Sequence, residues 1–178
     1  SLMMGKNCHI VIYPLNQIKE LNLVCIIRDK KYDPDNIKTL VNKVVTQNSN
    51  LEKVFEGDLK SWPLYFTPKI LPSTNSKVFY IGDAFNGFLP TLAQGAGQSI
   101  ESAHELFNLI KDDKAEIQNT YFKERSRRAK IVKRRSNINF FVFHFSSSIM
   151  QTLRNFFMKF LVKRKSFVNS YLGTVYKN

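Results

Sequence analysis

Short apolar stretches in the first half of the chain have the length and the β-branched content of strands. Residues 9–13 and 21–28 form one such pair, joined by a turn around residues 14–17. Apolar and polar positions alternate over residues 62–67, which predicts a third strand of the same sheet. The run at residues 77–81 predicts a further, buried strand.

Helical spacing of apolar positions dominates elsewhere. It predicts a helix over residues 35–47, with a proline near its first turn, and a short helix over residues 49–54. It predicts a longer helix over residues 95–111, and after residue 114 helices that break near 146–148 and 163–165. The expected inner face of the 95–111 helix consists of Ile100, Ala103, Leu106, Phe107 and Ile110. The pattern as a whole predicts an α+β fold.

The charge is unevenly distributed. Residues 1–120 contain thirteen basic and thirteen acidic residues, whereas residues 121–178 contain fourteen basic residues and one acid, so they carry the whole net charge of +13. Such a basic region can bind nucleic acid or an anionic membrane. We favour the simpler interpretation of a solvated helix face, with some arginines paired to acids of an N-terminal half that is not part of this sequence. Phe156, Phe157 and Phe160 alternate with basic residues, a pattern that more often packs on a core or a partner than enters lipid. Peripheral membrane contact stays open as an alternative if the protein acts on a quinone-like lipid.

The remaining composition excludes several other classes. The two cysteines, Cys8 and Cys25, fall on separate predicted strands, with neither a metal-binding spacing nor a disulfide framework. Reduced thiols in a cytoplasmic protein are the expected state. The longest apolar run, residues 138–145, is too short to cross a bilayer, and no metal site is predicted.

The most informative segment is residues 82–106, which follows the predicted strand at 77–81. Asp83 lies just past the strand end, Pro90 lies in the turn beyond it, and small residues at 95–97 open a helix. A carboxylate in this place can accept hydrogen bonds from sugar-type hydroxyls, and free N–H groups at a helix start can face an electron-rich atom. Glycine there lets a flat ligand approach the main chain closely. The alternative is that Asp83 caps a turn and the glycines serve packing.

This segment resembles the second flavin-binding motif of the class A FAD-dependent aromatic monooxygenases, roughly G-D-A-A-H-x-x-x-P-x-x-G-Q-G-x-x-x-x-I-E-D-A. The matching positions are Gly82, Asp83, Ala84, Pro90, Gln94, Gly95, Ile100, Glu101 and Ala103. The resemblance implies that Asp83, beside Gly82, holds the ribityl chain of FAD and that the Pro90 segment borders the isoalloxazine ring. It also implies that Gly95, Ala96 and Gly97 supply backbone donors to the ring. The departures are Asn86 for the usual His, Ala93 for Gly and Ser102 for Asp.

The resemblance covers nearly the whole chain. Residues 5–14 resemble the G-x-x-x-H-x-x-x-Y-P strand of the family's substrate domain, and residues 61–65 its W-x-L-Y element. Residues 121–139 resemble its Y-x-x-x-R-x-x-R-A helix. The salicylate hydroxylase, 6-hydroxynicotinate monooxygenase and zeaxanthin epoxidase branch is the most similar. The family's first motif, G-x-G-x-x-G, which binds the ADP part of FAD, is absent. The resemblance therefore implies the C-terminal half of such an enzyme.

By the same resemblance, the chain divides into three parts. Residues 1–76 are a partial substrate-binding sheet region, residues 77–112 carry the G-D motif of the FAD domain, and residues 113–178 form a basic helical region. On the first strand His9 and Tyr13 point to one face, which in the family looks into the substrate cavity, and Thr91 borders the ring. The alternative is that His9 and Tyr13 are satisfied by hydrogen bonds in the core.

The implied activity is that of an oxidoreductase. The family hydroxylates an aromatic or related small molecule, with FAD as cofactor, O₂ as oxidant and NADH or NADPH as electron donor. We expect this chain to be inactive without an N-terminal half, supplied upstream or as a separate chain. The alternatives are a non-catalytic remnant that pairs with a second copy, or a basic interaction module, with nucleic acid the less favoured partner.

Overall fold

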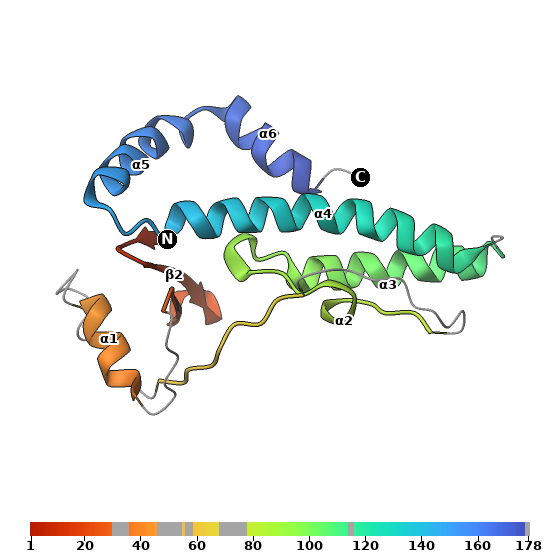
Figure 1. The fold of residues 1–178 in the computed structure, drawn as a ribbon, viewed down its shortest axis with the longest axis horizontal. Helices are drawn as coiled ribbons and strands as arrows, with labels where there is room; N and C mark the ends of the chain where they lie inside the picture. Colours follow the sequence, from red (N-terminus) through yellow and green to blue (C-terminus); the bar gives the residue numbers. More distant parts are fainter. Residues whose placement is uncertain (30–35, 46–54, 56–58, 68–77, 114–115, 177–178) are drawn as a thin grey trace. The chain divides into compact units, whose positions relative to one another are not determined.

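A computed structural model describes residues 1–29, 36–45, 55, 59–67, 78–113 and 116–176. They form a small antiparallel sheet and a larger set of helices (Figure 1), which confirms the α+β class in general terms. The chain divides into two compact units. Unit 1 comprises residues 1–63 and 141–167, and unit 2 comprises residues 64–140 and 168–178.

The sheet of unit 1 has three antiparallel strands in the order β1-β2-β3. The bounds are β1 (Leu2–Met4), β2 (Cys8–Leu15) and β3 (Glu20–Ile27), with a 3-10 turn, η1 (Asn16–Ile18), between the last two. β2 and β3 confirm the strands predicted at residues 9–13 and 21–28. In the register Ile10 lies opposite Cys25, and His9 lies opposite Ile26.

The sheet of unit 1 packs its Cys8 and Ile10 face against helix α1 (Ile37–Val45). Cys8 and Ile10 form a buried cluster with Val44 of α1, and neighbouring apolar residues of β3 complete it. α1 lies within the helix predicted at 35–47. The short helix predicted at 49–54 lies outside the described residues. The opposite face of the sheet carries His9, Val11 and Tyr13.

The third strand was predicted in the wrong place. β1, at the N-terminal end of the chain, pairs with β2, whereas residues 62–67 form no strand and expose the side chains of Trp62 and Tyr65. Pro63 has no N–H group to donate to a strand ladder, which explains part of the failure. Thr67 instead exchanges hydrogen bonds with Gly87, which ties this segment to the loop after α2.

Unit 2 is built on two long helices that lie side by side (Figure 1), α3 (Gly95–Lys111) and α4 (Ile117–Phe143), of which α4 ends in unit 1. The bounds of α3 are those predicted. A single helical turn, α2 (Asp83–Asn86), and a 3-10 turn, η4 (Pro90–Leu92), precede it. The core of unit 2 contains Phe85, Tyr121 and Ala129, with partly buried apolar neighbours.

The inner face of α3 differs from the prediction. Gln98 and Ser102 are buried and Leu106 is half-buried, whereas Ile100, Phe107 and Ile110 are 71%, 61% and 56% exposed. Two polar residues take the buried face because α4 and the helix backbone supply their hydrogen-bond partners. An apolar stripe (Ile100, Ala103, Phe107 and Ile110) is left on the outer face of α3.

The strand predicted at residues 77–81 is also not formed over its described part. Residues 78–81 pair with no other described strand, and Val78, Tyr80 and Ile81 are exposed. The carbonyl of Tyr80 accepts a hydrogen bond of 2.9 Å from the hydroxyl of Tyr121. An apolar, β-type sequence forms a strand only beside a neighbour with free backbone groups, and the described residues offer none here.

The helices predicted after residue 114 are confirmed. α4 is followed by α5 (Ser148–Leu161) and α6 (Lys165–Tyr176), and the breaks between them fall at the predicted positions. No helix in the described ranges has both the length and the apolarity needed to span a bilayer.

Candidate functional site

The candidate site begins at a sharp turn after residue 81. Gly82 has φ +57° and ψ −137°, a conformation that L side chains rarely adopt. Its carbonyl accepts hydrogen bonds from the N–H groups of Phe85 at 3.0 Å and of Asn86 at 2.9 Å. These bonds form α2, and they leave Asp83, the first residue of α2, at the surface.

Asp83 lies beside the start of α3. The carboxylate oxygen Oδ1 of Asp83 is 4.0 Å from the place that a Cβ would occupy on Gly95. Gln94 precedes the helix without a side-chain cap, and the first N–H bonded within the helix is that of Gln98, to the carbonyl of Gln94 at 2.8 Å. The N–H groups of residues 95–97 therefore have no helical acceptor, as at any helix N-terminus.

This arrangement places an acceptor next to several donors at an open surface. Asp83, Ala96 and Gly97 are exposed, and neither Gly95 nor Gly97 has a side chain to obstruct an approaching ligand. The carboxylate can accept hydrogen bonds from hydroxyl groups, while the helix N-terminus favours an electron-rich atom. This combination of one acceptor and several donors matches the hydrogen-bonding groups of the ribityl chain and of the ring edge of a flavin. It also suits the simpler role of a carboxylate that stabilises the helix start.

The Pro90 segment is fixed against α4. The hydroxyl of Thr91 donates to the carbonyl of Ser136 at 2.8 Å, and the side-chain amide of Asn139 donates to the carbonyl of Thr91 at 3.2 Å. Tyr171 of α6 in turn donates to the amide oxygen of Asn139. Thr91 therefore uses its hydroxyl within the protein, and Pro90 itself is exposed.

A buried polar network holds α3 against α4. Arg125 is 4% exposed, and its guanidinium contacts Glu101 at 3.4 Å, Glu105 at 3.3 Å and the side-chain oxygen of Gln98 at 2.9 Å. Arg128 contacts Glu101 at 3.3 Å. Burial raises the pKa of the Glu105 carboxyl despite the neighbouring Arg125. Two of the basic residues of the C-terminal region thus pair with acids of this chain.

The residues of the Y-x-x-x-R-x-x-R-A helix share one face of α4. They recur at spacings of three and four, and those that are buried are Tyr121, Arg125, Arg128, Ala129, Val132, Ser136 and Asn139. The sequence analysis predicted a solvated basic face for this helix. Four of its buried residues are polar, so their helical spacing does not appear as an apolar pattern: Arg125, Arg128, Ser136 and Asn139. The spacing of the motif itself, read as a helix face, was the signal that could have shown it.

Asn86 is a further buried polar residue, 1% exposed. Neither Oδ1 nor Nδ2 of its side-chain amide has a hydrogen-bond partner in the described part of the chain. Such an amide is costly to bury. It is the last residue of α2 and stands where the resembling family has histidine.

The substrate-facing candidates His9 and Tyr13 belong to unit 1 and lie on the same face of β2. His9 is 1% exposed, and its Nδ1 lies 3.1 Å from Nε2 of His144, which lies 3.3 Å from the carbonyl oxygen of Ile26. Burial, and secondarily the neighbouring His144, lowers the pKa of His9 to about 4. His9 is thus an internal neutral group, whereas Tyr13 is 45% exposed.

The described residues contain no cluster of three or more metal-ligating side chains. A shallow depression in unit 2 is lined by aromatic residues around Phe85 and Tyr121. It lies on the Tyr80 side of Phe85 and does not include Asp83 or the helix start.

Comparison with known protein families and with curated proteins finds no match for this chain.

Proposed function

We propose that this chain carries the ribityl and ring side of the flavin site of an FAD-dependent monooxygenase. The observation that carries the proposal is the position of Asp83 beside Gly95 at the uncapped start of α3. In this role the Asp83 carboxylate accepts hydrogen bonds from the ribityl hydroxyls. The N–H groups of Gly95, Ala96 and Gly97 donate to the electron-rich edge of the ring.

When bound, the flavin would supply the redox chemistry that activates O₂ for hydroxylation, with NADH or NADPH as electron donor. The contribution of this chain is to bind and orient the ring. The hydrogen bonds of Thr91 to Ser136 and of Asn139 to Thr91 hold the Pro90 segment in place. In unit 1, Tyr13 is the exposed member of the two substrate-facing candidates and would contact an aromatic or related substrate, whereas His9 is buried.

Two bare surfaces of unit 2 support a role as part of a larger flavoprotein. The apolar stripe on α3 is exposed, and residues 78–81 present an apolar segment with no strand partner in the described part of the chain. An exposed apolar surface of this kind is typical of an interface. We propose that a dinucleotide-binding half, encoded elsewhere or upstream, covers both and supplies the ADP site.

A fluorescence titration with two flavins tests the cofactor site. Riboflavin contains only the ring and the ribityl chain, whereas FAD adds the ADP part. Because this chain offers contacts to the ring and the ribityl chain alone, we expect it to quench both flavins with similar affinity. The Asp83→Ala variant should bind riboflavin and FAD at least about tenfold more weakly, because it loses hydrogen bonds to a charged group. Asp112→Asn, at the other end of α3, removes the same charge and should change nothing.

The same titration with a dinucleotide-binding half added completes the test. That half should tighten the binding of FAD and leave that of riboflavin nearly unchanged. If the chain quenches the fluorescence of neither flavin at high micromolar protein concentrations, with and without the added half, the proposal is contradicted. Sedimentation of the chain by itself distinguishes the alternative of a self-associating remnant, in which a second copy covers the α3 stripe.

A further inference from the structure

Helix α5 of unit 1 exposes an unusually apolar face. Ile149, Leu153, Phe156 and Phe160 recur at spacings of four, three and four, so they share one side of the helix. Met150 and Phe157 extend that side, and all six side chains are at least 42% exposed. This set of six residues is called the α5 face below.

The opposite side of α5 fixes the helix in unit 1. Arg154 is 5% exposed, and its guanidinium donates to the carbonyls of Val142 and Phe143 at the end of α4 and to the carbonyl of Met4 in β1. Gln151 donates to the carbonyl of Phe145 at 3.1 Å. These contacts direct Arg154 and Gln151 inward, so the α5 face points away from the core of its own unit.

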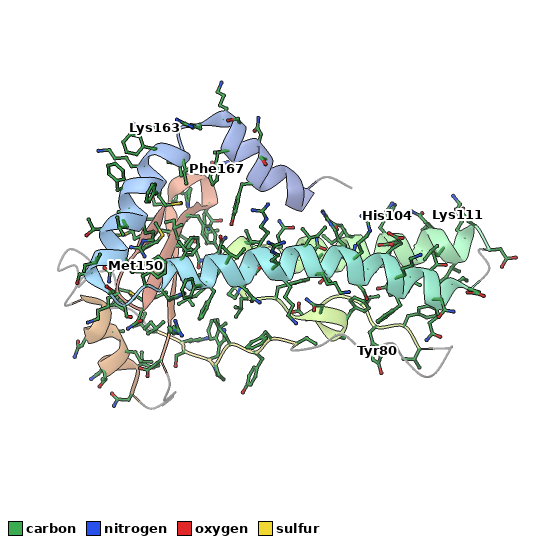
Figure 2. All side chains as sticks on the ribbon, turned by 45° about the horizontal axis from the view of Figure 1, so that its top comes forward. Tyr80, His104, Lys111, Met150, Lys163 and Phe167 are labelled. Atoms are coloured by element: carbon green, nitrogen blue, oxygen red, sulfur yellow. The ribbon has the colours of Figure 1, made fainter. Side chains whose placement is uncertain are left out.

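Positive charge accumulates at the C-terminal end of the same helix. Lys159 lies on α5, and Lys163, Arg164 and Lys165 follow directly after it, all of them exposed. In Figure 2 Met150 lies in the first turn of the helix and Lys163 lies just beyond its C-terminal end. The sequence contains no acidic residue after Glu124, so no carboxylate from residues 125–178 can neutralise this cluster.

We propose that the α5 face binds the surface of an anionic membrane. The helix lies in the plane of the interface, with its phenylalanines in the boundary between headgroups and acyl chains and its basic end against anionic headgroups. A helix of 14 residues is about 21 Å long, too short for a hydrocarbon core of about 30 Å. An apolar face flanked by lysine and arginine is typical of helices that lie on membranes.

The charge of the helix end argues against a second copy of the chain as the occupant. Two parallel copies of α5 would bring the same basic residues close together. Two antiparallel copies would place each basic end beside the start of the other helix, where residues 146–152 contain no acid. A lipid surface instead supplies both phosphate or carboxylate headgroups and apolar chains to one helix. The proposal is independent of the flavin site, because it involves no residue of that site.

Flotation with vesicles tests the proposal, using the full chain and no flavin. Vesicles of phosphatidylcholine alone are compared with vesicles that also contain phosphatidylglycerol, at low and at physiological salt. We expect binding to the anionic vesicles that weakens as salt is added. Replacing Phe156 and Phe160 together by serine should weaken the binding by at least about tenfold, because each buried phenylalanine contributes apolar area. Replacing Lys163 and Lys165 together by glutamine should weaken it by about tenfold or more.

A matched control uses the second exposed apolar surface of the chain. Replacing Ile100 and Phe107 of α3 together by serine removes comparable exposed apolar groups, and it should leave vesicle binding unchanged. Circular dichroism should show that all variants keep their helices, since every substituted side chain is exposed. The proposal is wrong if the unchanged chain does not float with anionic vesicles, or if both serine pairs reduce binding equally. It is also wrong if the Phe156 and Phe160 pair abolishes self-association in the absence of lipid.

Discussion

Gly82 lies so close to Ser99 that a Cβ on the glycine would be 2.7 Å from the hydroxyl oxygen of the serine and 3.2 Å from its Cβ. The contact joins the turn that carries Asp83 to the first turns of α3. Gly82 also has a positive φ of 57°. The glycine of the G-D motif therefore sets how close the carboxylate lies to the helix start.

The first prediction concerns this glycine. Gly82→Ala should lower the free energy of unfolding by about 2 kcal/mol, because the backbone conformation is strained for alanine and rotation of the Ser99 hydroxyl leaves the second contact in place. Gly87→Ala, whose Cβ would lie 3.4 Å from its nearest neighbour and whose φ is −75°, should change stability little. Urea denaturation measures both. An equal loss for the two variants would show that the Gly82 turn is not special.

The second prediction concerns the network between α3 and α4. Arg125→Ala leaves Glu105 and the side-chain oxygen of Gln98 without their partner, and we expect a loss of about 3 kcal/mol in unfolding free energy. Arg127→Ala breaks an exposed pair with Glu124, whose members are 73% and 43% exposed, and should cost less than about 0.5 kcal/mol. Denaturant unfolding of the two variants side by side gives the difference. Similar losses would mean that burial does not strengthen the Arg125 contacts.

The helix bounds and the faces of the helices differ in how well the sequence predicts them. The start of α3 was predicted because small residues follow a turn, and its length because apolar positions recur at helical spacing. Its buried face was mistaken, since Gln98 and Ser102 are buried through hydrogen bonds that hydropathy does not record. The same cause hid Arg125 on α4.

Whether a predicted strand forms depends on a neighbouring strand, and the local sequence pattern does not show whether one is there. β2 and β3 were predicted from their apolar, β-branched content and the turn between them, and each is the strand partner that the other needs. Residues 62–67 and 78–81 have strand-like composition, but a strand needs a neighbour with free backbone groups, and composition does not supply one. The closeness of Asp83 and Gly95 was expected only from the resemblance. The pairing of His9 with His144, 135 positions apart, followed from no local signal.

The third prediction concerns the pH dependence of unit 1. The pKa of His9 is lowered from 6.5 to about 4, so the folded state binds fewer protons than the unfolded state between these values. The stabilising contribution of neutral His9 should therefore be fully present above pH 6.5. It should be lost as the pH drops towards 4, which lowers the free energy of unfolding by roughly 3 kcal/mol. His9→Gln should flatten the dependence in that range. Urea unfolding at several pH values measures this dependence. If the unfolding free energy of His9→Gln changes with pH as steeply as that of the original chain, His9 is not the group responsible.

The last prediction concerns the two thiols of the sheet. Cys8 lies opposite Ile27 and Cys25 lies opposite Ile10, so the cysteines are diagonal neighbours, too far apart for a disulfide in this register. Burial, and secondarily Cys8, raises the pKa of Cys25 from 9.0 to about 12, and burial also raises that of Cys8.

Such a shift lowers the thiolate fraction of Cys25 by roughly a thousandfold, and the thiolate is the reactive form. The native chain at pH 8 should therefore react with Ellman's reagent at least about a hundredfold more slowly than the chain unfolded in urea, which should release two equivalents. A Cys25→Ala variant isolates Cys8, which should also be slow because it is buried. Rapid reaction of either thiol in the native chain would mean that the face of the sheet against α1 opens readily.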